Sequence, residues 1–305
     1  MNRIIRTIAA TLSLSVAAAC TGLPLSQTYD PLTMDPLAID AAFPPAVAEV
    51  TLTSHGARLP GILYLANGEG PHPTVVLAHG YPGNEKNLDL AQAMRRSGFN
   101  VLFFHYRGAW GADGTYSLTK VHEDVLAALA HLRGPEFAAA NRIDTDHLSA
   151  VGHSMGGFAV LRAASMDADL QCVAGMSSAN LAAKSADYDA DPDAAAAGFA
   201  AYTDSLFMLK GFSGAQVMQE LEDNRAAFDP ASFTEGLKGK SVFLITGEQD
   251  QVTPADRMQA PMVQLFSAEP EINLSHAVIP GDHSFSWSRQ ELASRVTGWL
   301  NENCR

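Results

Sequence analysis

Cysteine is scarce in this chain, and its scarcity limits the folds and chemistry available. Only 3 of the 305 residues are cysteine, too few for a domain held together by several disulfide bonds. The spacings Cys-x-x-Cys and His-Glu-x-x-His are absent, so the sequence has neither a zinc-finger nor a zincin motif. We therefore expect a fold stabilised by a hydrophobic core, with its chemistry carried out by ordinary side chains without a metal ion or another cofactor.

Basic residues are also few. Lysine and arginine total 20 against 33 for aspartate and glutamate, which gives a net charge of −13 at pH 7. Such a charge repels phosphate backbones, so we do not expect nucleic acid as a partner. Charged residues make up 17% and hydrophobic residues 47% of the chain. This composition excludes a wholly disordered chain and a coiled coil, and it suffices for a large buried core.

The apolar run near the start of the chain is short. Arg3 and Arg6 precede small and apolar residues at 8–19, and this stretch ends at Cys20. A membrane-spanning helix needs roughly 20 apolar residues, so the run has instead the layout of an export signal. Its last residues, Ala-Ala-Ala-Cys, resemble the lipobox of bacterial lipoproteins, whose cysteine becomes the lipidated N-terminus. We expect residues 1–20 to be a lipoprotein-type signal peptide and Cys20 to anchor the protein to the cell envelope. Plain cleavage, giving a periplasmic or secreted protein, is the alternative.

A proline-rich segment follows the signal. Residues 21–47 carry five prolines among small residues, a composition typical of an extended tether with little regular structure. We expect one globular domain over residues 48–305. An oxidising compartment would permit Cys172 and Cys304 to pair. Cys172 lies in an apolar run, however, and this favours a buried free thiol.

The pattern of the domain alternates between short apolar runs and amphipathic segments. Continuous apolar runs are typical of strands buried on both faces. Their alternation with helices predicts an α/β fold with a mostly parallel central sheet flanked by helices. The expected strands span residues 49–54, 59–66, 74–78, 100–105, 147–151, 170–176, 241–246 and 273–279. The expected helices span residues 88–96, 120–132, 155–165, 254–266 and 287–300.

One interval between strands is much longer than the others. Roughly sixty residues separate the strand that ends near Met176 from the strand that begins near Ser241, more than one helix and two loops require. The pattern within it is compatible with two or three short helices. We therefore expect a helical cap inserted late in the sheet, over about residues 177–240.

Gly152-His-Ser-Met-Gly156 supplies the first catalytic candidate. This Gly-x-Ser-x-Gly pattern follows an expected strand and opens an expected helix, the context of a nucleophile elbow. Its glycines leave room for the cramped turn that holds the serine hydroxyl outward. We predict Ser154 as the nucleophile. A serine hydroxyl is a weak nucleophile at neutral pH, so a histidine must accept its proton and a carboxylate must orient that histidine.

The base and the acid are sought later in the chain, because folds with this elbow follow the order serine, acid, histidine. His276 lies within an apolar run and is interpreted as a strand residue, whereas His283 follows that strand and is predicted as the base. Two carboxylates follow the preceding strand. Asp250 is predicted as the acid because of its offset and the Val-x-Pro after it, with Glu248 as the alternative. Asp282 adjoins the base but points elsewhere if its loop is extended.

Backbone amides must also stabilise the oxyanion of a tetrahedral intermediate. Met155, directly after the nucleophile, is predicted to supply one amide. The loop after the strand 74–78 reads His79-Gly-Tyr-Pro-Gly, and its proline has no N–H, so Tyr81 is the predicted second donor. His79 precedes the nucleophile in the chain, which favours a structural hydrogen-bonding role for it.

These features together resemble the α/β-hydrolase superfamily from about residue 50 to the end of the sequence. The segments 79–86 (His-Gly-Tyr-Pro-Gly-Asn-Glu-Lys) and 106–111 (Tyr-Arg-Gly-Ala-Trp-Gly) resemble the prolyl-oligopeptidase and acylaminoacyl-peptidase branch, which shades into dienelactone-hydrolase-like proteins. Dienelactone hydrolases have a cysteine nucleophile where Ser154 stands here, so their chemistry is disfavoured.

The resemblance implies a reaction and a substrate class. Ser154 would attack the ester, thioester or amide carbonyl of a small-molecule or peptide-like substrate, and water activated by His283 would hydrolyse the acyl-enzyme, with no cofactor. The cap would shape the pocket together with Trp110 and Tyr116, the candidate substrate contacts. We expect a carboxylesterase of the cell envelope. An acylaminoacyl or dipeptidyl-type peptidase is the alternative, and a non-catalytic envelope-binding lipoprotein is a remote one.

Overall fold

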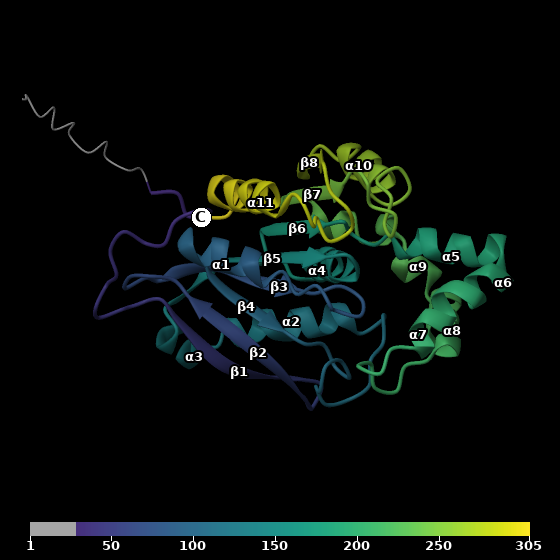
Figure 1. Cartoon of the computed structure of the whole chain (residues 1–305), viewed down its shortest axis with the longest axis horizontal. Coiled ribbons are helices and arrows are strands. Elements are labelled where there is room, and N and C mark those ends of the chain that lie inside the picture. The colour runs from purple at the N-terminus through teal and green to yellow at the C-terminus, as the bar shows by residue number, and fades with distance from the viewer. Residues whose placement is uncertain (1–28) are drawn as a thin grey trace, which may run out of the picture.

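A twisted eight-stranded sheet forms the centre of the molecule, in the order β1-β2-β4-β3-β5-β6-β7-β8 (Figure 1). The computed structural model describes residues 29–305, so the expected signal peptide and Cys20 lie outside the described residues. β2 pairs antiparallel with β1 and with β4, and the other neighbours pair in parallel. The strands are β1 (Ala46–Ser54), β2 (Ala57–Leu65), β3 (His72–Ala78), β4 (Asn100–Phe104), β5 (Ile143–His153), β6 (Cys172–Met176), β7 (Ser241–Gly247) and β8 (Asn273–Ile279).

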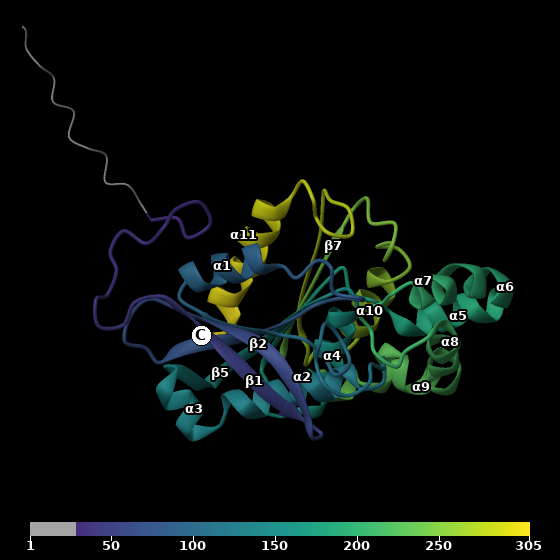
Figure 2. The same cartoon turned by 60° about the horizontal axis from the view of Figure 1, so that its bottom comes forward.

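Helices cover both faces of the sheet (Figure 2). On one face, Leu90 and Met94 of α1 share a buried cluster with Leu292 and Trp299 of α11. The cluster on the other face includes α2, α4 and α10. β4 and β6 are buried along their whole length, as continuous apolar runs predict. The α/β fold with a mostly parallel sheet is thus confirmed. These helices are α1 (Leu88–Arg96), α2 (Val121–Leu132), α3 (Pro135–Ala140), α4 (Met155–Met166), α10 (Gln259–Ser267) and α11 (Arg289–Asn303).

Two of these helices differ from the sequence-based expectation. The short helix α3 was not expected, and α10 begins at Gln259 instead of residue 254. Pro261 explains the later start, because proline is tolerated in the first turn of a helix but removes a hydrogen bond from its interior. The carbonyl of Pro254 instead accepts the amides of Arg257 and Met258 in a preceding turn, at 3.1 and 2.9 Å.

The expected helical cap is present between β6 and β7. In Figure 1 its helices lie together at one end of the molecule, beyond the sheet. The middle of the cap is a continuous helical stretch in which a π-helical turn, η1, joins two short α-helices. The cap contains more helices than the two or three that the sequence pattern suggested. Its helical elements are α5 (Leu181–Ala190), α6 (Pro192–Ala195), η1 (Ala196–Ala200), α7 (Ala201–Asp204), α8 (Gly214–Asp223), α9 (Arg225–Phe228), η2 (Pro230–Ser232) and η3 (Glu235–Leu237).

The described part of the expected tether lies against the domain. Residues 29–45 contain no helix or strand, but the Tyr29 hydroxyl donates a hydrogen bond to the Arg96 carbonyl at 2.9 Å. The Arg96 Nε in turn donates to the Pro31 carbonyl at 2.6 Å. Between residues 29 and 305, the structure contains no helix long and apolar enough to cross a membrane.

A disulfide bond joins the middle of the sheet to the segment after α11. Cys172, at the start of β6, is bonded to Cys304, and both residues are buried. The expectation of a buried free thiol at Cys172 is therefore wrong. The apolar run around Cys172 indicates burial correctly, but it carries no information on a partner 132 residues away that α11 brings against the sheet.

Candidate active site

Ser154 lies at the sharp turn between β5 and α4. Its backbone has φ 58° and ψ −122°, a conformation that residues with a side chain rarely adopt. The turn is held on both sides, because the Ser154 amide donates to the Met176 carbonyl and the Ser154 carbonyl accepts from the Ala179 amide, at 2.8 and 2.9 Å. A Cβ atom on Gly152 would lie 2.1 Å from the carbonyl oxygen of Gly156, so only glycine fits at that position. The elbow therefore fixes where the Ser154 hydroxyl points.

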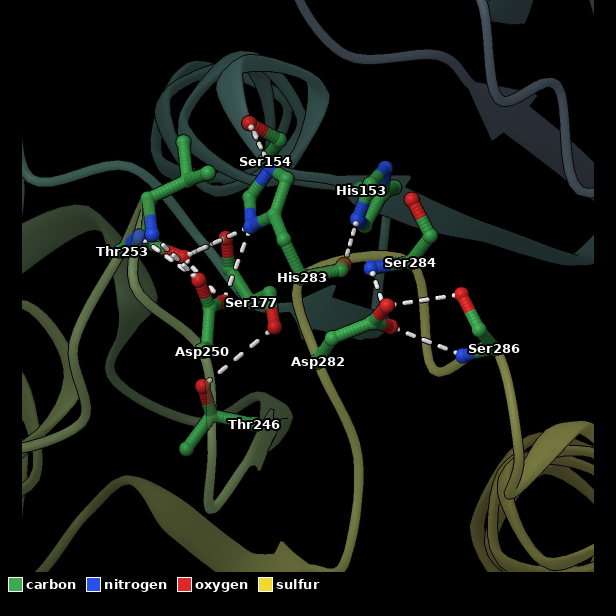
Figure 3. Close-up of polar contacts among 11 residues, drawn as sticks. His153, Ser154, Ser177, Thr246, Asp250, Thr253, Asp282, His283, Ser284 and Ser286 are labelled. Atoms are coloured by element: carbon green, nitrogen blue, oxygen red, sulfur yellow. Dashed lines mark hydrogen bonds and ion pairs between the residues drawn. The ribbon is translucent and has the colours of Figure 1, made fainter.

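His283 and Asp250 complete a line of hydrogen bonds with Ser154 (Figure 3). The Ser154 Oγ lies 3.0 Å from His283 Nε2, and His283 Nδ1 lies 2.8 Å from Asp250 Oδ2. All three residues follow strands of the parallel part of the sheet, β5, β7 and β8, at their carboxyl ends. Because Nδ1 donates its proton to Asp250, Nε2 is free to accept the proton of the serine hydroxyl.

Asp250 is held in its ionised form inside the protein. Only 2% of the residue is exposed, and burial alone would raise its pKa. The hydrogen bond from His283 and its electrostatic attraction, together with hydrogen bonds from Thr253, instead hold the pKa of Asp250 well below its usual range. The amides of Val252 and Thr253 both donate to Asp250 Oδ1 at 2.8 Å. The carboxylate therefore has a fixed orientation as well as a fixed charge.

The Thr253 hydroxyl is a further member of this network. Its Oγ1 lies 2.6 Å from Asp250 Oδ2, 3.1 Å from His283 Nδ1 and 3.0 Å from the carbonyl of Ser177. The hydroxyl has one proton to donate, and its lone pairs accept a share of the His283 N–H. Thr253 is the middle residue of the Val-x-Pro pattern that favoured Asp250 over Glu248, but the role of the threonine itself was not predicted.

His153, inside the Gly-x-Ser-x-Gly motif, was also missed. It is 2% exposed, and its Nε2 donates a hydrogen bond of 2.7 Å to the carbonyl of His283. Burial first, and then repulsion by His283, lowers the pKa of His153 to about 3, so the ring is neutral at physiological pH. His153 thereby supports the loop that presents His283. The signal in the sequence that could have identified His153 is its position directly before Ser154.

The structure does not bring the other acidic candidates to His283. Glu248 is exposed, and its carboxylate accepts a hydrogen bond from the neighbouring Gln249 side chain. Asp282 accepts hydrogen bonds from the amides of Ser284 and Ser286 (Figure 3). Among residues 29–305, no group of three or more His, Cys, Asp or Glu side chains is placed to hold a metal ion.

The two amides predicted as oxyanion donors lie beside Ser154. Met155 is the first residue of α4, where backbone amides have no acceptor within the helix. Within the described residues, the Tyr81 amide makes no hydrogen bond. The loop that carries Tyr81 approaches Ser154 closely, since a Cβ on Gly80 would lie 2.9 Å from the Cβ of Ser154. His79 supports this loop from behind, and its Nδ1 donates to the Gly80 carbonyl at 2.8 Å.

The side chain of Tyr81 connects this loop to the cap. Its hydroxyl donates a hydrogen bond of 2.8 Å to the Thr203 Oγ1 of α7. Burial is the main cause that raises the pKa of Tyr81, so the phenol remains protonated and able to donate. The Tyr81 ring also lies 5.7 Å from the ring of Phe199 in the π-helical turn. The cap and the loop are therefore positioned together.

Two cavities meet at Ser154 and His283. The larger has a volume of about 420 Å³ and is mostly apolar, with Leu118, Leu181, Phe199 and Val252 in its walls. The smaller has a volume of about 160 Å³ and is lined by polar backbone and side chains of the segments 80–85 and 283–284. Tyr81 and Tyr202 border both. The site thus has room for two unlike substituents on either side of a reacting carbonyl.

Trp110 and Tyr116 do not line either cavity, which corrects their prediction as substrate contacts. Trp110 packs behind the Tyr81 loop, where its Nε1 donates to the carbonyl of Pro82 at 2.7 Å. Tyr116 is 3% exposed, and its ring lies 5.7 Å from that of Tyr81 and 5.1 Å from that of Phe212. Both aromatic residues therefore support the loop instead of forming the pocket surface.

Comparison with known proteins identifies the family of this chain. Residues 75–295 match the model of the alpha/beta hydrolase family, and the chain belongs to this family. It is 30% identical over 129 residues to the esterase EstD of Thermotoga maritima, an alignment that covers 38% of this chain and 29% of EstD.

Solved structures with the same fold include an esterase and a peptidase. The esterase Pf2001 of Pyrococcus furiosus superposes with a TM-score of 0.64 at 20% identity, covering 87% of this chain and 93% of Pf2001. The acylaminoacyl peptidase of Pyrococcus horikoshii gives a TM-score of 0.60 at 15% identity, covering 84% of this chain and 41% of the peptidase. At these identities the likeness establishes the fold alone.

Proposed function

We propose that this protein is a serine hydrolase that cleaves esters, most simply a carboxylesterase, with Ser154, His283 and Asp250 as its catalytic triad. The observation that carries the proposal is the line of hydrogen bonds from the Ser154 Oγ through His283 to Asp250, at 3.0 and 2.8 Å. Both distances lie within about 2.6–3.2 Å, the range in which a base takes a proton from a nucleophile. Membership of the alpha/beta hydrolase family supports the same conclusion.

The reaction begins when the Ser154 Oγ attacks the ester carbonyl while His283 Nε2 accepts the hydroxyl proton. The carbonyl oxygen becomes an oxyanion, to which the amides of Met155 and Tyr81 donate hydrogen bonds. The bond to the alcohol then breaks, and His283 returns its proton to the departing alkoxide. Water attacks the acyl-enzyme by the same route, giving the carboxylic acid and free Ser154. Asp250 remains ionised throughout and stabilises the imidazolium of His283.

A fluorophosphonate probe and a panel of substrates test this proposal. We expect the probe to label the wild-type protein at Ser154, and Ser154→Ala to abolish both labelling and hydrolysis of p-nitrophenyl butyrate. Folded protein that is not labelled, together with equal turnover by Ser154→Ala, would overturn the proposal. Aminoacyl-naphthylamides in the same panel address the peptidase alternative, and their hydrolysis at rates comparable with the esters would favour it.

We further propose that the protein is exported and anchored through a lipidated Cys20. The support comes from Arg3, Arg6 and the apolar stretch that ends at Cys20. The Cys172–Cys304 disulfide agrees with an oxidising compartment, because reducing compartments keep such thiols free. Mass spectrometry of the mature N-terminus provides the test. A diacylated or triacylated Cys20, lost in Cys20→Ala, is expected, and an unmodified N-terminus beyond residue 20 would contradict the anchor.

A further inference from the structure

The larger cavity contains one lysine among mostly apolar walls. Lys184 lies on α5, three residues after Leu181, and both residues line the cavity together with Ser154 and His283. Residues three apart share one face of a helix, so Lys184 lies one turn further along α5, about 4.5 Å from Leu181 along the helix axis. The Ala179 amide, just before α5, donates to the Ser154 carbonyl at 2.9 Å. Helix α5 therefore begins close to Ser154 and carries Lys184 one turn further from it.

The ammonium group of Lys184 has no partner within the described residues. The residue as a whole is partly buried, and its ammonium makes no hydrogen bond and no ion pair there. The acidic residues that follow it on α5 are already engaged. Asp187 pairs with Arg257, and Asp189 pairs with Arg225. Lys184 borders the larger cavity and also a neighbouring one of about 390 Å³, whose lining includes Asp187 and Asp191, but no carboxylate pairs with its ammonium within the described residues.

A partly exposed cation without a carboxylate partner in the described residues can pair with a charged ligand that enters the cavity. An anionic group on the substrate would do so, and its hydrogen bond to the ammonium would be charge-assisted. No arginine or second lysine lines the cavity, so the site supplies one positive charge. A single charge matches a carboxylate better than a phosphate, which proteins bind with several donors.

We propose that Lys184 binds a carboxylate at the far end of the acyl group, so that the preferred substrates are monoesters of dicarboxylic acids. This inference rests on the proposed esterase function and adds the substrate class. The apolar walls of Leu181 and Phe199 would contact the methylene chain between the two ends. The smaller polar cavity would take the alcohol.

Methyl esters test the proposal, because methanol is so small that the acyl chain must occupy the larger cavity. Hydrolysis of monomethyl adipate and of methyl hexanoate, which have acyl chains of equal length, is followed by proton release. In the wild type we expect the ratio of their kcat/KM values to favour the adipate ester. Lys184→Met should lower that ratio about 10- to 100-fold, the usual effect of losing a hydrogen bond to a charged group, and Lys184→Arg should restore most of it.

The exposed Lys210 provides the matched control, since Lys210→Met removes the same charge outside the cavity. We expect this variant to keep the wild-type ratio. An unchanged ratio in Lys184→Met, or an equal fall in Lys210→Met, would overturn the proposal. A series from monomethyl succinate to monomethyl sebacate should show one preferred length, and this preference should be lost in Lys184→Met.

A binding experiment separates this proposal from the proposed function. Calorimetry with monomethyl adipate on Ser154→Ala requires no turnover. Binding that weakens about 10-fold or more when Lys184→Met is added supports the carboxylate site, even for a protein that hydrolyses no ester. Equal affinity in the two proteins would overturn it, even if the wild type is an active esterase.

Discussion

Lowering the pH should destabilise this protein through its buried histidines. His79 and His153 are 1% and 2% exposed, and burial is the main cause that lowers the pKa of each from 6.5 to about 3. Below pH 6.5 the unfolded chain binds a proton at each site, whereas the folded protein remains unprotonated until the pH approaches 3. Stability is therefore lost as the pH falls from 6.5 towards 3.

The size of the effect follows from the same two pKa values. Within that window each histidine lowers the free energy of unfolding by about 1.4 kcal/mol per pH unit. At pH 5 the loss is about 2 kcal/mol for each histidine and about 4 kcal/mol for the pair. Because typical domains have a total stability of about 5–15 kcal/mol, this loss is a substantial fraction of the total.

Urea unfolding at a series of pH values from 8 to about 4.5 measures this dependence. His153→Gln keeps a donor for the His283 carbonyl but does not titrate. Below pH 6 the free energy of unfolding of this variant should therefore fall less steeply than that of the wild type, and the two slopes should differ by about 1.4 kcal/mol per pH unit. Contributions of the carboxylates are common to both proteins and cancel in the comparison. His276→Gln, at an exposed position of β8, should retain the wild-type slope. Parallel curves for the wild type and His153→Gln would refute the reasoning.

Three further changes give separate tests of the site and the fold. Asp250→Asn removes the charge that orients His283, and kcat for p-nitrophenyl butyrate should fall by about 10⁴-fold; a loss below tenfold would argue against this acid. Phe199→Ala removes a wall shared by the cavity of about 420 Å³ and a neighbouring cavity of about 390 Å³. The preferred p-nitrophenyl ester should therefore shift from butyrate towards octanoate, and an unchanged chain-length profile would contradict this. Replacing Cys172 and Cys304 by serine together should lower the free energy of unfolding by about 2–5 kcal/mol in urea titrations without reductant, and equal stability would show that the bond does not form.

Much of the sheet could be predicted because its signals are local. Strands buried on both faces need continuous apolar runs, and these runs stand out between amphipathic helices. The start of α10 was placed too early because the interior of an expected helix included Pro261, which the structure places in the first turn. Contacts between distant segments had no such signal. The docking of residues 29–45 and the Cys172–Cys304 bond both depend on packing far along the chain.

The same distinction applies to the site. Ser154, Asp250 and His283 each follow a strand, and the parallel sheet brings the carboxyl ends of its strands to one edge. Local motifs were therefore sufficient to select residues that lie together. His153 was missed because its partner is the backbone of a loop 130 residues away. Whether Trp110 faces a cavity or packs behind a loop is decided by the cap and the loop together, which no short pattern encodes.

The hydrogen bond from Tyr81 to Thr203 limits how freely this enzyme could be re-engineered. The cap is a continuous insertion between two strands, so exchanging it for a different one would be the obvious way to change substrate range. Yet Thr203 of the cap accepts the hydrogen bond from the hydroxyl of Tyr81, and the amide of Tyr81 is the proposed donor to the oxyanion. A transplanted cap that lacks a hydroxyl at this position would change the walls of the pocket. It would also leave Tyr81 without its hydrogen-bond partner and so weaken catalysis. Designs should therefore retain α7 and vary α5 and α8.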